Sequence, residues 1–182
     1  LNHQRTATNL EEKILNSSNV NPRQFGLLFT RDVVGHIYSQ VLYVPHLRIP
    51  ATKRVHNVVF VTTMANNIYA FDADNPRRTR PLWTKNFGPS LPVDDGMIGV
   101  PSAHCEKYTD IQIEVGIVST PVIDVKSKTM YFVTTNKMSH TPYVVKHFLH
   151  AIDITTGNQK PNSPVSIEGK LPGNGLGSNM GK

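Results

Sequence analysis

The chain has 182 residues, of which 38% are hydrophobic, and it carries a formal net charge of +6. These values fit one globular domain and exclude a membrane-spanning helix, because no apolar run approaches the roughly 20 residues that a span needs. The basic residues are scattered and do not form a stripe with interleaved aromatics, so nucleic acid is not expected as a partner.

The first 33 residues are predicted to contain two elements. Residues 1–24 form an N-terminal strap, in which the capping-box pattern of Thr8 and Glu11 favours a short helix ending at Ile14. Residues 25–33 are expected to form a strand without a partner in its own unit, of the kind that closes a ring of sheets. Asn16-Ser17-Ser18 is a candidate glycosylation site if the protein is secreted, and any signal peptide is absent or already removed.

Residues 34–88 are predicted to form a first four-stranded unit. Period-2 alternation and turn residues place its strands at 36–44, 57–64, 67–74 and 81–87, with a hairpin at 64–67. A long insertion at 46–56 separates the first two strands. Because loops on a fixed scaffold vary most, this insertion is predicted to offer a variable surface.

Residues 89–114 are predicted to form a long connecting loop that could serve as a binding surface. Its candidate residues are Asp94, Asp95, His104, Cys105 and Glu106, with Asp110 nearby. Adjacent residues of a loop rarely converge on one ion, so a metal or catalytic site is not favoured there. Cys105 is the only cysteine. It is therefore a buried free thiol, a disulfide partner for a cysteine elsewhere, or a reactive thiol.

Residues 115–169 are predicted to form a second four-stranded unit, with strands at 116–125, 129–135, 146–154 and 164–168. Its insertion falls at 136–145, between the second and third strands. His147 and His150 are expected on opposite faces of their strand, so they do not share a metal ion. Residues 170–182 are a glycine-rich linker expected to lead to a missing next unit.

The two units repeat each other in sequence. The segment from Val59 to Thr63 returns at 131–135, and the segment from Tyr69 to Ala73 returns at 150–154, so that Phe60 aligns with Phe132 and Tyr69 with His150. Repeats of this kind predict an all-β propeller segment of two four-stranded antiparallel blades plus the leading strand. A β-sandwich is the alternative. Two blades cannot close a ring of roughly 4 to 8, so the partners are expected to be further blades or further protein chains.

The third predicted strands carry a family signature. Ala70-Phe71-Asp72 and Ala151-Ile152-Asp153, the latter followed by Thr155-Thr156-Gly157, resemble the Ala-x-Asp-x-x-Thr-Gly motif of the pyrroloquinoline-quinone (PQQ)-type propeller repeat. In physical terms, the alanines let blades approach, and Asp72, Asp153 and Gly157 are suited to form turns. Trp83 resembles the family tryptophan that docks between blades, and the second unit has no equivalent.

The resemblance implies either an enzyme or a scaffold that has lost its cofactor. A quinoprotein dehydrogenase would need PQQ, calcium and a pair of adjacent cysteines, and the chain has Cys105 alone. PQQ and calcium are therefore disfavoured, and no catalytic residue is assigned. We expect a secreted, non-enzymatic propeller scaffold or binding module. The alternatives are a quinone-dependent alcohol or sugar dehydrogenase and a carbohydrate-binding propeller.

Overall fold

A computed structural model describes residues 10, 12–93, 110–140, 143–169 and 172. The chain divides into two compact parts, Leu1–Arg31 and Asp32–Lys182. In the part from Leu1 to Arg31, the described residues form turns and no helix or strand. The helix predicted to end at Ile14 is therefore wrong over its described residues. The Glu12 carboxylate accepts the backbone N–H groups of Ile14 and Leu15 at 2.7 and 2.9 Å, which fixes a side-chain turn in place of a helical one.

The strand predicted at 25–33 is also absent, because residues 24–33 carry no regular secondary structure. A single extended segment leaves its backbone N–H and C=O groups without ladder partners. Phe25, Leu27 and Leu28 are exposed along it. Its alternation of apolar residues predicted a strand, but no described strand pairs with it.

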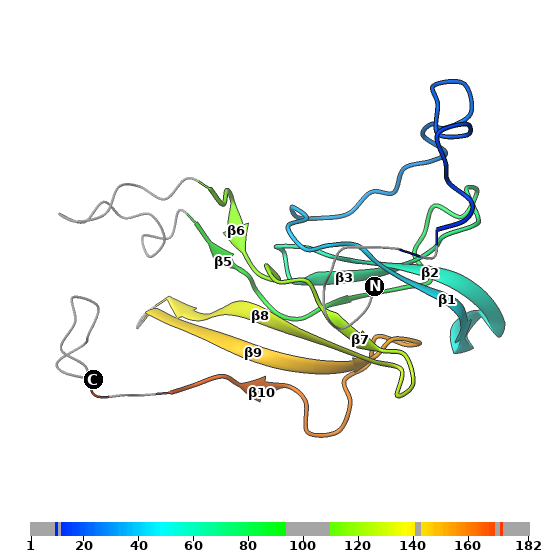
Figure 1. Cartoon of the computed structure of the whole chain (residues 1–182). Helices are drawn as coiled ribbons and strands as arrows, with labels where there is room; N and C mark the ends of the chain where they lie inside the picture. Colours follow the sequence, from blue (N-terminus) through cyan, green and yellow to red (C-terminus); the bar gives the residue numbers. More distant parts are fainter. Residues whose placement is uncertain (1–9, 11, 94–109, 141–142, 170–171, 173–182) are drawn as a thin grey trace. The chain divides into compact units, whose positions relative to one another are not determined.

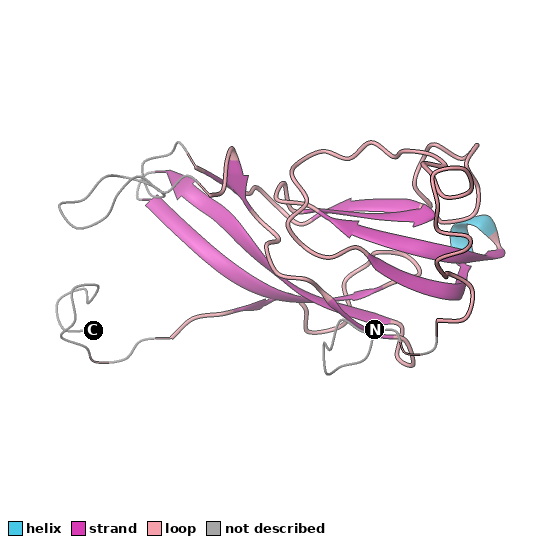
Figure 2. Cartoon of the chain, turned by 45° about the horizontal axis from the view of Figure 1, so that its top comes forward, coloured by secondary structure: helices cyan, strands magenta, loops and turns pink. Residues whose placement is uncertain are grey.

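The part from Asp32 to Lys182 is all-β and its sheets are antiparallel, as predicted (Figures 1 and 2). The first sheet has the order β1 (Leu42–Ile49), β2 (Arg54–Thr62), β3 (Asn67–Asp72) and β4 (Trp83–Asn86). The second has the order β10 (Val165–Ser166), β9 (Tyr143–Asp153), β8 (Thr129–His140) and β7 (Val122–Asp124). A third, small sheet pairs β5 (Leu91–Pro92) with β6 (Glu114–Val115), at the two ends of the connection predicted as a loop.

Both predicted insertions are strand extensions instead of loops. In the first sheet, β1 continues to Ile49, a 3₁₀ turn follows at Pro50–Thr52, and β2 begins at Arg54. In the second, β8 continues to His140 and β9 begins at Tyr143. Pro45 has no N–H for the ladder, and a bulge between Val44 and Leu47 absorbs it, so pairing resumes beyond the position where the sequence predicted its end.

The pairing register corrects the sequence alignment by one residue. Phe60 pairs with Ala70, whereas the residue that pairs with Ala151 is Tyr131; Phe132 pairs with His150. When the two sheets are matched by placing Ala70 on Ala151, Phe60 therefore corresponds to Tyr131 and not to Phe132. A slip of one residue moves a side chain to the other face of its sheet, so aligned aromatic residues lie on opposite faces.

Two backbone hydrogen bonds agree with this corrected correspondence. The Met64 N–H donates to His36 O at 2.9 Å, and the Thr135 N–H donates to Gly116 O at 3.3 Å. At the other end of the sheets, the Ala73 N–H donates to Asn57 O at 2.8 Å, and the Ile154 N–H donates to Lys128 O at 3.0 Å. In each pair of bonds, the donors and the acceptors occupy corresponding positions in or next to the strands, so the two sheets share a hydrogen-bonding plan as well as a strand order.

The hydrophobic core lies between the two sheets. The Ala70 face of the first sheet contributes Val58, Phe60 and Ile68, and the Phe132 face of the second contributes Met130 and Ile152; all are almost fully buried in one cluster. Burial of each large side chain contributes about 1.5–3 kcal/mol. Trp83 joins the sheets, because its ring lies 5.8 Å from that of Phe60 and its Nε1–H donates to Ile154 O at 3.0 Å.

The opposite face of the second sheet carries an exposed patch of apolar side chains. Register places Val122 beside Tyr131, and Leu149 beside Val165, on the face that also carries Ala151. The four large side chains are 40, 42, 41 and 55% exposed, respectively. We call the surface formed by Val122, Tyr131, Leu149 and Val165 the open face.

Candidate functional site

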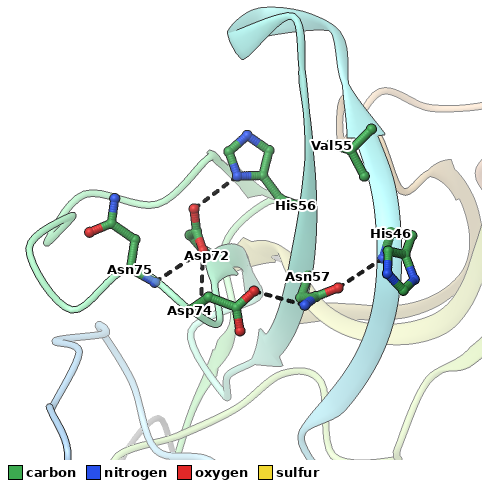
Figure 3. Close-up of a pocket in the computed structure, with 7 residues that line it drawn as sticks. All are labelled: His46, Val55, His56, Asn57, Asp72, Asp74 and Asn75. Carbon is green, nitrogen blue, oxygen red and sulfur yellow. Dashed lines mark hydrogen bonds and ion pairs between the residues drawn. The ribbon is translucent and has the colours of Figure 1, made fainter.

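An open pocket of about 330 Å³ lies at one end of the first sheet (Figure 3). The extended β1–β2 hairpin forms one wall, and the turn after β3 forms the other. Its lining residues are His46, Val55, His56, Asn57, Asp72, Asp74 and Asn75. The pocket therefore uses the 46–56 segment that the sequence predicted as a variable surface. At the corresponding end of the second sheet, β7 and β8 are joined by the short turn between Asp124 and Thr129.

Asn57 holds the two walls of the pocket together. The bulge gives His46 a φ of 52°, and the His46 N–H donates to Asn57 Oδ1 at 3.0 Å. Asn57 Nδ2 donates to Asp74 Oδ2 at 2.7 Å. These contacts can be followed in Figure 3. Because one amide is fixed at both its ends, the Asp74 carboxylate is pre-positioned at the pocket wall.

Asp72 forms the second anchor of the pocket. Its Oδ1 accepts the N–H groups of Asp74 and Asn75 at 3.0 and 3.2 Å, and its Oδ2 lies 2.8 Å from His56 Nδ1. Burial raises the pKa of the Asp72 carboxyl, but the backbone hydrogen bond from Asp74, the His56 contacts and the backbone hydrogen bond from Asn75 outweigh it, and the net pKa is lowered. Asp72 thus stays ionised while it holds the turn after β3.

Thr52, His56 and Asp72 form a continuous array of contacts, since Thr52 Oγ1 lies 2.8 Å from His56 Nε2 and His56 Nδ1 contacts Asp72. A hydroxyl, an imidazole and a carboxylate in this order are the parts of a nucleophilic triad. Here, however, Thr52 Oγ1 also lies 3.2 Å from Ile49 O and accepts the Arg54 N–H at 3.3 Å, and Thr52 does not line the pocket. The array therefore fastens the hairpin to the β3 turn and is not assigned to acyl transfer.

The residues that carry the resemblance are spread over the turns, the interface between the sheets and the open face. Asp153 Oδ1 accepts the Thr155 N–H at 2.7 Å and its hydroxyl at 2.6 Å. Burial raises the pKa of Asp153, but the Thr155 bonds and Lys160 lower it overall. Ala70 is fully buried, whereas Ala151 is half-buried on the open face. A Cβ added to Gly157, whose φ is 73°, would lie 2.8 Å from the Trp83 ring.

His150 is a buried, neutral histidine in a hydrogen-bonded network. It stacks on Phe132 with a centroid separation of 4.8 Å, and its nitrogens contact Thr134 at 3.0 Å and Gln159 at 2.7 Å. Burial lowers its pKa to about 4, although the Gln159 bond raises it slightly. His147 lies on the opposite face, as alternation predicts, and is exposed. His150 corresponds to Tyr69 in the strand register as well as in the sequence, because each directly precedes one of the matched alanines, but nothing in the sequence pointed to Gln159.

Among the remaining candidates from the sequence, none that the structure describes lines the pocket. Asp94, Asp95, His104, Cys105 and Glu106 fall outside the described residues. The Asp110 carbonyl accepts the Tyr38 hydroxyl at 3.0 Å. Asn16 is exposed in a turn, where its Oδ1 accepts the Ser18 N–H at 2.9 Å. Sequence reasoning missed His56, Asn57 and Asp74. The available signal was the polar pair 56–57 at the start of a strand that pairs with an Asp-x-Asp segment.

Over the described ranges, no group of three or more His, Cys, Asp or Glu side chains is placed to hold a metal ion. None of the helices described is long and apolar enough to cross a membrane. No family model matches the chain, and neither a curated protein nor a solved structure matches it significantly.

Proposed function

We propose that the two sheets are successive blades of a β-propeller of the PQQ-type repeat, and that this propeller is a secreted, non-enzymatic binding scaffold. The observation that carries the proposal is the direction in which the sheets stack. The Ala70 face of the first sheet packs onto the second, whereas the matching Ala151 face of the second sheet is the open face. Corresponding faces therefore point the same way along the stack.

Head-to-tail stacking favours a propeller over a β-sandwich. Two sheets in a sandwich bury their inner faces against each other and carry polar side chains on their outer faces. The open face instead presents Tyr131 and Leu149. A heterologous contact of this kind always leaves a complementary face free, and it can be repeated until a ring closes. The open face is then the surface that the next blade covers.

A binding role is supported by the place where the sheets differ. Their common hydrogen-bonding plan builds the scaffold, and the extended β1–β2 hairpin adds the pocket to the first sheet alone. Polar side chains fixed on strand extensions are a suitable frame for a ligand, because little conformational entropy is lost on binding. The exposed Asn16 sequon is compatible with secretion.

The stacking proposal is tested by changing the open face of the full chain. The double substitution Tyr131→Glu and Leu149→Glu puts two charges where a blade would dock. We expect the unmodified chain to associate through this face, and the double variant to elute as a smaller species in size-exclusion chromatography with light scattering. Val125→Glu and Met138→Glu form the control, because both residues are exposed and lie outside the open face.

Near-UV circular dichroism establishes that each variant remains folded. A folded, monodisperse monomer of the unmodified chain would contradict the proposal, and so would equal loss of association in the control. Quinone absorbance, or calcium-dependent dye reduction with alcohols or sugars by the full-length protein, would contradict the non-enzymatic part.

A further inference from the structure

Two groups of basic residues that are separate in the sequence flank the same pocket. The hairpin contributes Arg48, Lys53 and Arg54, and the connection after β3 contributes Arg77, Arg78 and Arg80. Arg54 directly precedes the pocket residue Val55, and Arg77 follows the pocket residue Asn75 by two positions. Arg48 pairs with Val55 across the hairpin, and the Arg77 N–H donates to Asn75 Oδ1 at 3.1 Å, so basic residues of both groups adjoin the pocket lining. We call the six residues the basic rim.

The basic rim is not neutralised by its surroundings. Within the described part of the chain, none of the six side chains forms an ion pair. All six are exposed except Arg78, which is half-buried and whose Nε is buried without a hydrogen-bond partner among those residues. The nearby carboxylates are already engaged, Asp72 with His56 and Asp74 with Asn57. The rim therefore presents unpaired positive charge around a polar cavity.

The cavity inside the rim has the chemistry of a site for hydroxyl groups. Asp74 offers a carboxylate, and Asn57 and His46 can each both donate and accept hydrogen bonds. Val55 adds a small apolar surface. A hydroxyl group donates and accepts at the same time, so it suits such a mixed lining. The volume of about 330 Å³ lies near the lower end of the range of about 300–1,000 Å³ for ligand pockets, which suits one sugar ring.

We propose that the pocket and the basic rim bind an acidic carbohydrate, a glycan that carries carboxylate or sulfate groups. One ring occupies the pocket through its hydroxyl groups, and Arg77 and Arg80 pair with anionic groups on this ring or its neighbours. Arginine suits this role because its planar fork matches carboxylate and sulfate oxygens. The inference rests on the proposed binding function and names the ligand class of the same site.

Nucleic acid also carries negative charge, but the site lacks the platform that bases need. Single-stranded nucleic acids are held largely by stacking on aromatic side chains. The pocket lining contains imidazole rings and no Phe, Tyr or Trp. The chemistry of the lining therefore favours hydroxyl groups over base faces.

The test measures binding of the full chain to fluorescein-labelled oligosaccharides by anisotropy. A heparin octasaccharide supplies sulfate, an oligogalacturonate supplies carboxylate alone, and a neutral dextran oligomer supplies neither. We expect the acidic probes to bind and added salt to weaken them, because ion pairs are screened. Arg77→Ser with Arg80→Ser should lower the affinity about tenfold, which is the loss of one or two charge-assisted contacts.

Lys126→Ser with Lys128→Ser is the matched control, because it removes the same charge from the short turn of the second sheet. Its effect should stay within about twofold, as for exposed charges that make no contact with the ligand. Equal losses in both double variants would overturn the site. Equal binding of neutral dextran, or tighter binding of a single-stranded DNA oligomer of the same charge, would overturn the ligand class.

Asp74→Ala separates recognition in the pocket from simple charge attraction. Charge attraction predicts tighter binding of acidic probes, because a negative charge is lost. Recognition predicts weaker binding, with partial recovery in Asp74→Asn, whose amide oxygen can still accept from Asn57. Tighter binding by both variants would refute the role of the pocket. If glycan binding fails while association through the open face persists, the ligand inference falls and the propeller proposal stands.

Discussion

Gly116 lies against the turn between β2 and β3 with no room for a side chain. A Cβ added there would lie 2.0 Å from Met64 O and 2.6 Å from Asn66 Oδ1. Asn66 is fully buried with a φ of 55°, and its Nδ2 donates to Thr135 O at 2.9 Å. The turn between β2 and β3 is thus held directly against the second sheet, with no space for a side chain at Gly116.

We therefore predict that Gly116→Ala lowers the free energy of unfolding by about 3 kcal/mol, because the backbone must shift to relieve the overlap. Urea denaturation followed by Trp83 fluorescence measures the change. Gly169→Ala is the control, since nothing lies within 4 Å of its added Cβ, and its effect should stay below about 0.5 kcal/mol. Equal midpoints for the two variants would show that the contact at Gly116 is not tight.

At the scale of elements, β8 and β9 are joined by a polar network that runs from the surface into the core. The Ser163 hydroxyl donates to Gln159 Oε1, Gln159 contacts His150, and His150 contacts Thr134. Thr134 donates to Asn136 at 2.5 Å, and Asn136 Nδ2 donates to Phe87 O at 2.9 Å. The network runs from β9 across β8 to the segment after β4, so the charge state of His150 affects the contact between the sheets.

This network predicts a loss of stability at mildly acidic pH. The unfolded chain protonates His150 near pH 6.5, whereas the folded chain does so only near pH 4. The unfolded state binds more protons between these values, so stability falls as pH decreases from 6.5 to 4, by roughly 1–3 kcal/mol. The lowered pKa values of Asp72 and Asp153 act in the same direction, but only below their ordinary value of 3.8.

Urea denaturation at pH 7 and pH 4.5 measures this effect. His150→Gln keeps hydrogen-bonding atoms but cannot titrate in this range, so we expect a smaller difference between the two pH values. His147→Gln is the matched control on the exposed face of the same strand. A pH dependence that is unchanged in His150→Gln would mean that other groups cause it.

The sequence predicted elements well where their patterns are local. Alternation and turn residues identified β2, β3, β8 and β9 and the antiparallel order of both sheets. The ends of β1 and β2 were misjudged, because Pro45 is a strand-ending signal that a bulge overcomes. Register was also missed, since Phe60 and Phe132 match in sequence and only backbone pairing separates them. The pocket depends on contacts between residues 46–57 and 72–75, which no local pattern contains.

At the scale of the whole molecule, the open face links stability to concentration. If a second copy covers the open face, folding and association are coupled by mass action. We predict that the midpoint temperature of unfolding rises with protein concentration for the unmodified chain, and that Tyr131→Glu with Leu149→Glu removes this dependence. Differential scanning calorimetry over a hundredfold range of concentration is the measurement. A midpoint that does not change with concentration in either protein would argue against self-association through this face.

The shared hydrogen-bonding plan of the two sheets also defines a site for engineering. Because Asn57 and Lys128 carry corresponding carbonyls, the short turn after Asp124 marks the place where a longer hairpin fits the second sheet without a change of register. Transplanting residues 46–57 there would create two adjacent copies of one recognition hairpin. Two linked sites raise the effective concentration of the second binding event, so a weak single contact would become an avid one.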